Sequence, residues 1–302
     1  MFRVPFAHTD TIMHRIISTL IAVAATFAAA SSSNPLRAEV TVPDEYKQGG
    51  WAIGCQAWTF TKFTVYEAIE KTAEAGGKLI EFFPDQKLSK EEPGVKWGHN
   101  ASEDVVAKVK AKLAQHKIMA INYGVVGIPK DEAAARKIFE FAKKMGLRAI
   151  TTESTESIDT IEKLVKEFDI QVGFHEHGRR LTHPEYKVWD PLYIRNVCDG
   201  RDPRIGACAD TGHWQTSGIN PVYALRLLKG RVISCHLKDK TDYGESAHDV
   251  PYGTGVGEIA RCLEELKKQN FQGNISVEFE YKMENNVAEA KQCIDFVREH
   301  AR

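Results

Sequence analysis

The sequence predicts a single-domain parallel (β/α)8 barrel, a TIM barrel, on the strength of three observations. From residue 50 onward, short apolar runs alternate with amphipathic helical stretches, and there are eight such runs. The runs are apolar on both faces, which is typical of a parallel sheet covered by helices. About 260 of the 302 residues remain after the first forty, and a barrel of this kind needs roughly 250 residues.

The eight apolar runs are the expected strands. In chain order they cover residues 51–58, 78–84, 118–126, 148–154, 170–178, 204–214, 232–239 and 275–281. Between the first four of them, apolar residues recur at every third or fourth position over 64–77, 102–116 and 131–146, which predicts helices. The last of these stretches ends in Gly146, a residue suited to a helix C-cap.

The chain after residue 45 reads as one domain, because no linker, low-complexity tract or change of composition interrupts it. An open, doubly wound sheet is the alternative architecture. It would require a glycine-rich phosphate-binding loop after the first strand, and GCQAWTFTKF over 54–63 is not such a loop. The barrel is therefore the preferred prediction.

The first 38 residues predict a leader. A polar, basic stretch over 1–15 precedes IISTLIAVAATFAAA over 16–30, which has the length of the apolar region of a signal peptide. It is too short and too alanine-rich for a membrane span. Cleavage is expected near Ala30 or after Ala38, and Met13 is an alternative start. We expect a signal peptide and leader over 1–38, a mature barrel over 39–302, and a periplasmic or extracellular protein without a membrane anchor. A buried N-terminal helix is the alternative.

The composition is that of an ordinary soluble globular protein, with 43% hydrophobic residues and a formal net charge of -1. That charge offers no basic surface for nucleic acid or for an anionic membrane. The six cysteines show no paired spacing of the kind that small disulfide-bonded proteins use. We expect them to be mostly small buried hydrophobic residues, with Cys198 left undecided.

Titratable side chains gather at the carboxyl ends of the last five expected strands. These are Glu153; His175, Glu176 and His177; Asp210 and His213; His236, Lys238 and Asp239; and Glu278 and Glu280. Catalytic groups of a (β/α)8 barrel come from this end of the strands. Because successive strand residues alternate faces, residues two apart, such as His175 and His177, share a face. The sequence therefore predicts one rim that is rich in carboxylates and imidazoles.

Some of these residues have a plainer explanation. A single histidine at a strand end is more often a hydrogen-bonded structural residue than a ligand. Glu280 could pair with Lys282 as an ordinary rim residue. Lys238 is expected to lay its stem along apolar surface with its charged head at the rim, and Glu176 is expected to face the barrel wall or a neighbouring helix.

Four residues support a shared metal ion more strongly, because Glu153, Asp210, His236 and Glu278 each end an apolar run. An unpaired charge there would be costly, and a divalent cation is the simplest common partner. Mixed imidazole and carboxylate ligands suit Mn²⁺, Co²⁺, Zn²⁺ or Fe²⁺ better than Ca²⁺. We therefore expect one bound divalent metal ion, which is one of these four or Mg²⁺. No compact motif such as HExxH occurs, so the prediction rests on the repeated position at strand ends.

Three motifs carry a family resemblance: DTGHW over 210–214, CHLKD over 235–239 and VEFE over 277–280. They resemble the sugar phosphate isomerase/epimerase family of xylose isomerase-like TIM barrels, and the similarity extends over about 50–298. It implies a divalent metal held by a Glu, by the Asp of a D-x-x-H element, by a His from the next strand and by a Glu from the last. Asp210, His236 and Glu278 match the last three, and His213 matches a substrate-contacting position.

The first glutamate of that ligand set is where the chain departs from part of the family. Ketose 3-epimerases place it on the fifth strand, where this sequence has His175. Inosose dehydratase-like members carry a Glu at the end of the fourth strand and a His-rich fifth strand. Glu153 in TTES, followed by FHEHG over 174–178, resembles that second arrangement. The fourth ligand is thus expected to be Glu153 or His175, and elimination or dehydration becomes a rival to epimerisation.

The resemblance implies proton abstraction next to a carbonyl of a sugar. A chelated divalent metal would stabilise the resulting enediolate, and Glu153, Glu278 or His177 would transfer the proton. Substrate contacts are expected from His177, His213, Lys238, Glu280, Trp58 and Trp214, and Tyr252 is a further aromatic candidate at the rim. We expect a metal-dependent isomerase, epimerase or lyase that acts on an unphosphorylated sugar or keto-sugar, since phosphorylated sugars are mainly cytoplasmic.

Two other functions stay open as alternatives. An endonuclease IV-like nuclease shares the barrel, but the leader and the near-zero charge argue against nucleic acid as a partner. A sugar-binding protein without catalysis would be expected to have lost its metal ligands, and at least four candidates remain. The expected partner is a small carbohydrate, and assembly into a homo-oligomer is left open.

Overall fold

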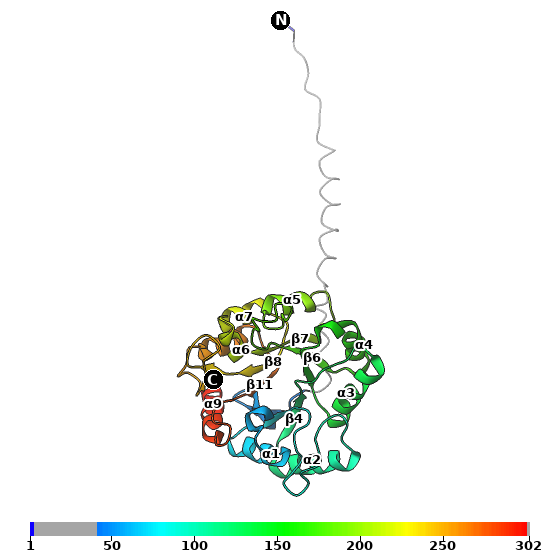
Figure 1. The fold of residues 1–302 in the computed structure, drawn as a ribbon. Helices are drawn as coiled ribbons and strands as arrows, with labels where there is room; N and C mark the ends of the chain where they lie inside the picture. The colour runs from blue at the N-terminus through cyan, green and yellow to red at the C-terminus, as the bar shows by residue number, and fades with distance from the viewer. Residues whose placement is uncertain (3–40, 301–302) are drawn as a thin grey trace. The chain divides into compact units, whose positions relative to one another are not determined.

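Eight parallel strands close into a barrel in the computed structural model, which describes residues 1–2 and 41–300 (Figure 1). The strands are β2 Trp51–Gln56, β3 Leu79–Phe82, β4 Met119–Tyr123, β5 Ala149–Thr152, β6 Gln171–His175, β7 Ile205–Asp210, β8 Val232–Leu237 and β11 Asn274–Val277. They neighbour one another in chain order, and the first strand, β2, pairs in parallel with both β3 and β11. This closure confirms the predicted (β/α)8 barrel: seven strands lie within their predicted runs, and β11 begins one residue before the run over 275–281.

The helices form a ring outside the strands (Figure 1). They are α1 Val65–Glu74, α2 Glu103–His116, α3 Glu132–Met145, α4 Ile158–Phe168, α5 Pro191–Cys198, α6 Thr211–Thr216, α7 Pro221–Leu227, α8 Ile259–Lys268 and α9 Val287–Glu299. Side-chain caps start several of them: Thr64 and Glu67 form a reciprocal capping box at α1, and Asp131 caps α3. Gly146 ends α3 in the left-handed conformation, as its position predicts.

Shorter elements fill the connections. A two-residue strand β1 (Lys47–Gln48) lies antiparallel to β2, and β9 (Asp239–Lys240) pairs with β10 (Asp249–Val250) in the loop after β8. The 3-10 turns are η1 Asp44–Tyr46, η2 Ala57–Phe60 and η3 Thr155–Ser157. Several predicted runs extend past the strands they contain, and one of them changes the position of side chains: the run over 204–214 ends as a strand at Asp210, and helix α6 begins at the next residue.

The core occupies the barrel and the layer between strands and helices. Every residue of β2, β3, β5, β6, β7 and β11 is buried, which is the burial expected of a parallel sheet covered on both faces. All six cysteines are buried and free, so the expectation of small buried residues is confirmed and extends to Cys198. None of the helices among the described residues is long and apolar enough to cross a membrane. Residues 3–38 of the predicted leader lie outside the described residues.

Candidate active site

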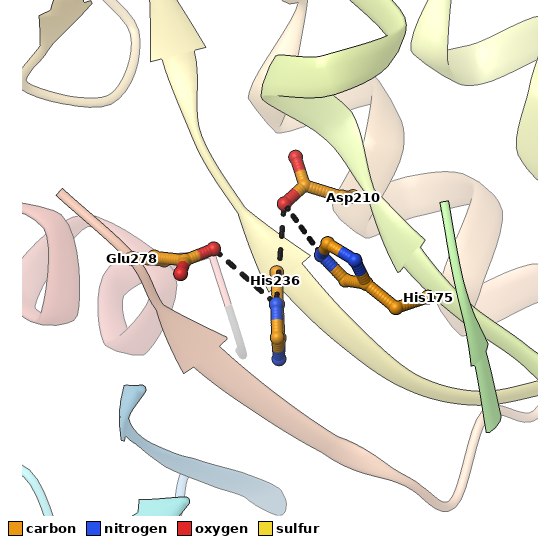
Figure 2. Close-up of side chains that lie close together, drawn as sticks. All are labelled: His175, Asp210, His236 and Glu278. Atoms are coloured by element: carbon orange, nitrogen blue, oxygen red, sulfur yellow. Dashed lines mark ion pairs between the residues drawn. The ribbon is translucent and has the colours of Figure 1, made fainter. Parts of the chain in front are cut away.

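Four buried side chains meet at the carboxyl end of the barrel. His175 ends β6, Asp210 ends β7, His236 lies one residue before the end of β8, and Glu278 follows β11 directly. Each offers one ligand atom, and these four atoms all lie within 4.8 Å of one another. Figure 2 shows the four side chains pointing toward a common centre from their separate strands. The cluster arises because neighbouring parallel strands end at the same edge.

Asp210 serves the helix and the cluster with different oxygens. Its Oδ1 accepts a hydrogen bond of 2.8 Å from the backbone N–H of His213 and so caps α6. Its Oδ2 lies 3.5 Å from His175 Nε2 and 3.9 Å from His236 Nδ1. Burial opposes ionisation, but the nearby His213 imidazole and Lys238 ammonium hold the pKa of Asp210 well below its ordinary value. The carboxylate is thus fixed in orientation and charged.

His236 lies between two carboxylates. Its Nδ1 is 3.3 Å from Glu278 Oε2, and its Nε2 is 3.1 Å from Glu81 Oε1, on the barrel-interior side of the cluster. Burial would raise the pKa of Glu81, but attraction to His236 and hydrogen bonds from Thr151 and Ser276 hold it below its usual value. Burial likewise opposes protonation of His236, and the neighbouring Cys208, Glu81 and Glu278 still raise its pKa well above the ordinary value.

Glu153 lies behind His175. Its Oε1 is 3.3 Å from His175 Nδ1, and its Oε2 accepts a hydrogen bond of 2.7 Å from the Tyr186 hydroxyl. Although burial opposes it, the contact with His175 keeps the pKa of Glu153 below its ordinary value. Of the two candidates for the fourth ligand, the structure therefore places His175 in the cluster and Glu153 against its other ring nitrogen. Metal-binding histidines commonly donate that second nitrogen to a carboxylate.

Lys238 does not extend its head to the rim. Its side chain is fully buried, and Nζ lies 3.0 Å from Asp210 Oδ2, 2.7 Å from Glu278 Oε2 and 2.8 Å from Glu280 Oε2. Burial disfavours its charge, yet these three carboxylates raise the pKa of Lys238 well above the ordinary value. The expected exposed head was wrong because three clustered carboxylates attract the ammonium more strongly than water does. Lys238 neutralises part of the site's negative charge.

A cavity of about 330 Å³ opens above the cluster. His175 and Glu278 lie in its wall, together with the predicted residues Glu153, His177, His213, Glu280 and Trp58. Burial lowers the pKa of His177, and it lowers that of His213 well below the ordinary value. The two imidazole rings lie 4.2 Å apart. Trp58 is 40% exposed, and its indole N–H donates to Glu280 Oε1 at 3.1 Å.

Two predicted aromatic contacts do not reach this cavity. Trp214 is fully buried on α6 and packs into the hydrophobic core. The helix that begins at Thr211 carries its indole away from the strand end, which the predicted longer strand could not do. Tyr252 is also buried, with its hydroxyl bonded to the backbone oxygen of Leu237. Glu176 is completely buried, as expected of a wall-facing residue, and burial raises its pKa well above the ordinary value.

The donor set fits a divalent transition metal. Two imidazole nitrogens and two carboxylate oxygens converge, and this mixture suits Mn²⁺, Co²⁺, Zn²⁺ or Fe²⁺. Asp210 Oδ2, Glu278 Oε2 and His236 Nδ1 are buried atoms that form ion pairs but no well-aligned hydrogen bond. Buried polar atoms in native proteins nearly always find such a partner, so the pattern agrees with ligands for an ion.

The sequence reasoning missed two residues that support the site. Glu81 stands in the apolar run LIEFF, and a lone carboxylate in such a run is the same signal that identified Asp210. Tyr186 lies in the loop between β6 and α5, where no periodicity predicts a direction for its side chain. Only the fold shows that its hydroxyl reaches Glu153.

Comparison with known proteins agrees with this architecture. The uncharacterised protein from Parabacteroides distasonis ATCC 8503 is 29% identical, with a TM-score of 0.66 over 83% of this chain and 99% of that one. A D-allulose 3-epimerase from Methylomonas sp. is 16% identical, with a TM-score of 0.61 over 86% of this chain and 100% of that one. A xylose isomerase domain protein from Alicyclobacillus acidocaldarius is also 16% identical, with a TM-score of 0.62 over 83% and 99%.

At 16% identity these likenesses show the fold alone. No curated protein matches the chain. The family model described as "Xylose isomerase-like TIM barrel" matches residues 69–300, which is most of the barrel and contains all four residues of the cluster. The chain therefore belongs to the xylose isomerase-like TIM barrel family.

Proposed function

We propose that this protein is a divalent-metal-dependent enzyme of the sugar isomerase/epimerase type, which abstracts a proton next to the carbonyl of an unphosphorylated sugar or keto-sugar. The observation that carries the proposal is the convergence of His175, Asp210, His236 and Glu278 beneath a cavity of about 330 Å³. The solved structures of epimerases that share the fold support the same reaction class.

The four residues of the cluster would hold the metal. When bound there, a divalent ion supplies Lewis acidity, which lowers the pKa of a C–H bond beside a carbonyl oxygen. Glu153 and His177 line the same cavity and are the groups for proton transfer. Glu153 is the candidate to accept the proton as a carboxylate, with its oxygens in contact with His175 and Tyr186, and burial favours the neutral form of His177.

The charges of the cavity favour a neutral substrate. Glu153, Glu278 and Glu280 line it, and none of its lining residues is a lysine or an arginine. The ammonium of Lys238 lies within 3.0 Å of three carboxylate oxygens and is already compensated. A phosphate group would meet surplus negative charge there. Export directed by residues 1–38, which we also propose, agrees with an unphosphorylated substrate.

Elimination from a keto-sugar or a 3-keto-glycoside is the second candidate reaction. It is favoured by His175, which stands in the cluster in place of a carboxylate. Lyase chemistry requires one base beside the acidified carbon and one acid for the leaving oxygen. Glu153 and the imidazole of His177 are the candidates for these two roles, because both line the cavity and both neighbour His175.

Metal analysis of the purified protein tests the proposal. Protein prepared without chelator should contain about one divalent transition metal per chain, and Asp210→Ala and His236→Ala should lose it. His248→Ala is the matched control, since His248 is exposed in the loop after β8. The loaded protein is then incubated with ketoses, aldoses and 3-keto-glycosides, with NMR as the readout. Full activity of metal-free protein would rule out the proposal.

A further inference from the structure

A second cavity lies beside the site cavity, on the loop between β6 and α5. Its volume is about 240 Å³, and Glu153 lines both cavities. The rest of its lining comes from that loop, from η3 and from α5. Nothing in the proposed reaction uses this space.

One hydrogen-bonded pair stands between the two cavities. The Tyr186 hydroxyl donates to Glu153 Oε2 at 2.7 Å, and the Tyr186 ring lies 6.3 Å from the ring of His177, which lines the site cavity. Tyr186 itself lines the second cavity. A molecule that spans the pair would place one part over the cluster and another part in the second cavity. The bond joining the two parts would lie next to Glu153.

The lining of the second cavity suits a neutral, hydroxyl-bearing group. Its carboxylates are Glu153, Glu156 and Glu185, and its cations are Arg180 and Lys187. This mixture has no surplus positive charge for a phosphate or a carboxylate ligand. Polar groups dominate, because Val188 is the one aliphatic side chain in the lining. Such side chains can donate to and accept from sugar hydroxyls on several sides.

Two tyrosines, Tyr186 and Tyr193, form part of the wall of the second cavity. Tyr193 lines it, with its hydroxyl held 3.0 Å from Thr155 Oγ1. Arg180 lies 3.9 Å over the ring of Tyr186 and covers one of its faces. A pocket for a drug-sized ligand usually measures about 300–1,000 Å³. The site cavity, at about 330 Å³, already lies at the lower end of this range, and the second cavity of about 240 Å³ adds room for a further group.

We propose that the second cavity binds the second sugar ring of a glycoside whose first ring occupies the site cavity. The inference rests on the proposed function and assigns its substrate class: a disaccharide-like glycoside in place of a free monosaccharide. It also makes the loop between β6 and α5 the determinant of that preference.

Calorimetric titration of the metal-loaded protein with matched sugars tests the inference. The probes are monosaccharides, aldose and ketose, and disaccharides that contain them. The best disaccharide should bind at least about tenfold more tightly than its monosaccharide. The double variant Arg180→Ala/Glu185→Ala should remove this advantage and leave monosaccharide affinity within about twofold of the unaltered protein. Both residues are exposed, so the variant should fold normally.

Thr182→Ala is the control on the same loop, because Thr182 is exposed and does not line the cavity. Equal affinities for disaccharides and monosaccharides would overturn the inference. An equal loss of disaccharide affinity in the double variant and in Thr182→Ala would also overturn it. Failure of every sugar to bind, with the metal in place, would overturn the proposed function itself. The two failures are therefore distinguishable.

Discussion

Nε2 of His236 lies 3.1 Å from Oε1 of Glu81, a carboxylate buried inside the barrel on strand β3. The contact fixes the imidazole so that Nδ1 faces Glu278 and Asp210. Glu81 is held in turn by Thr151 and Ser276 at 2.9 and 3.0 Å. Glu81 therefore orients a candidate metal ligand without itself facing the cavity.

Replacing that carboxylate should weaken metal binding. Glu81→Gln keeps the shape of the side chain but removes the charge that polarises His236, and the loss of such a partner typically costs 10–100-fold in metal affinity. We expect a loss of about tenfold, measured by competition with a chelator. Glu74→Gln makes the same charge change at an exposed position of α1 and should have no effect. Equal affinities for the two variants would contradict the role given to Glu81.

The close approach of β2 and β3 predicts that Gly54 cannot be replaced. A Cβ added at this position would lie 1.8 Å from the backbone oxygen of Leu79, its partner on β3. Since backbone cannot move aside as a flexible side chain can, Gly54→Ala should reduce the free energy of unfolding by at least about 2 kcal/mol. Urea denaturation measures this loss. Gly94→Ala, where a Cβ meets no atom within 4 Å, should change stability by less than about 0.5 kcal/mol.

A buried ion pair away from the site gives another stability prediction. Arg204 donates from Nε and Nη2 to the two oxygens of Asp202 at 2.9 and 2.8 Å, and both side chains are buried. Arg204→Met would leave the Asp202 carboxylate without its cation, which should cost about 3 kcal/mol in thermal or urea unfolding. Lys291→Met removes an exposed partner of Asp295 and should cost less than about 1 kcal/mol. A variant at Arg204 as stable as the control would refute the argument.

The same pair predicts a pH dependence. The hydrogen bonds from Arg204, acting against burial, hold the pKa of Asp202 below its ordinary value of 3.8. A carboxyl whose pKa is depressed in the folded state stabilises that state above the unfolded-state pKa, and the contribution is lost as pH falls through the folded-state pKa. The stability difference between the unaltered protein and Arg204→Met should thus be constant near neutral pH and should narrow below about pH 4. A stability difference that widens as pH falls would contradict this prediction.

Much of the fold was predictable because each strand is a short apolar run between helical patterns. Boundaries were less predictable where a capping side chain decides them. Asp210 both ends β7 and caps α6, and a strand that ends there turns Trp214 into the core. The hydrophobic pattern of ACADTGHW over 207–214 does not reveal where the strand ends. The helix starts because the backbone N–H of His213 donates a hydrogen bond to Asp210, and a hydrophobic pattern carries no information about such a bond.

For the site, the sequence allowed us to predict which strand ends carry charged side chains. Asp210, His236 and Glu278 come together because the barrel brings the ends of β7, β8 and β11 to one edge. The choice between Glu153 and His175 was not predictable, since it depends on which side chain reaches the centre from neighbouring strands. The burial of Lys238 was also not predictable, because its long stem could place the ammonium at the rim or, as found, between three carboxylates.

The remaining prediction concerns reaction type and depends on His175. Epimerisation requires a proton donor or acceptor on each face of one carbon, and two opposed carboxylates serve this purpose well. Here an imidazole stands in the cluster, 3.5 Å from Asp210 Oδ2, while Glu153 lies on its far side in contact with Tyr186. The two proton-transfer candidates, Glu153 and His177, thus both neighbour this imidazole, and no second carboxylate takes its place among the four residues of the cluster.

We therefore expect elimination from, or hydration of, a keto-sugar to exceed 3-epimerisation of free ketoses. The measurement is incubation in deuterated water with product analysis by NMR. An unsaturated or hydrated product should form, and Glu153→Gln should slow its formation by about 10²–10⁴-fold, the usual contribution of a general acid or base. Glu74→Gln, at an exposed position of α1 away from both cavities, is the matched control. Rapid interconversion of two ketose epimers, with one deuterium at the epimerised carbon and no unsaturated product, would show instead that the single imidazole suffices for epimerisation.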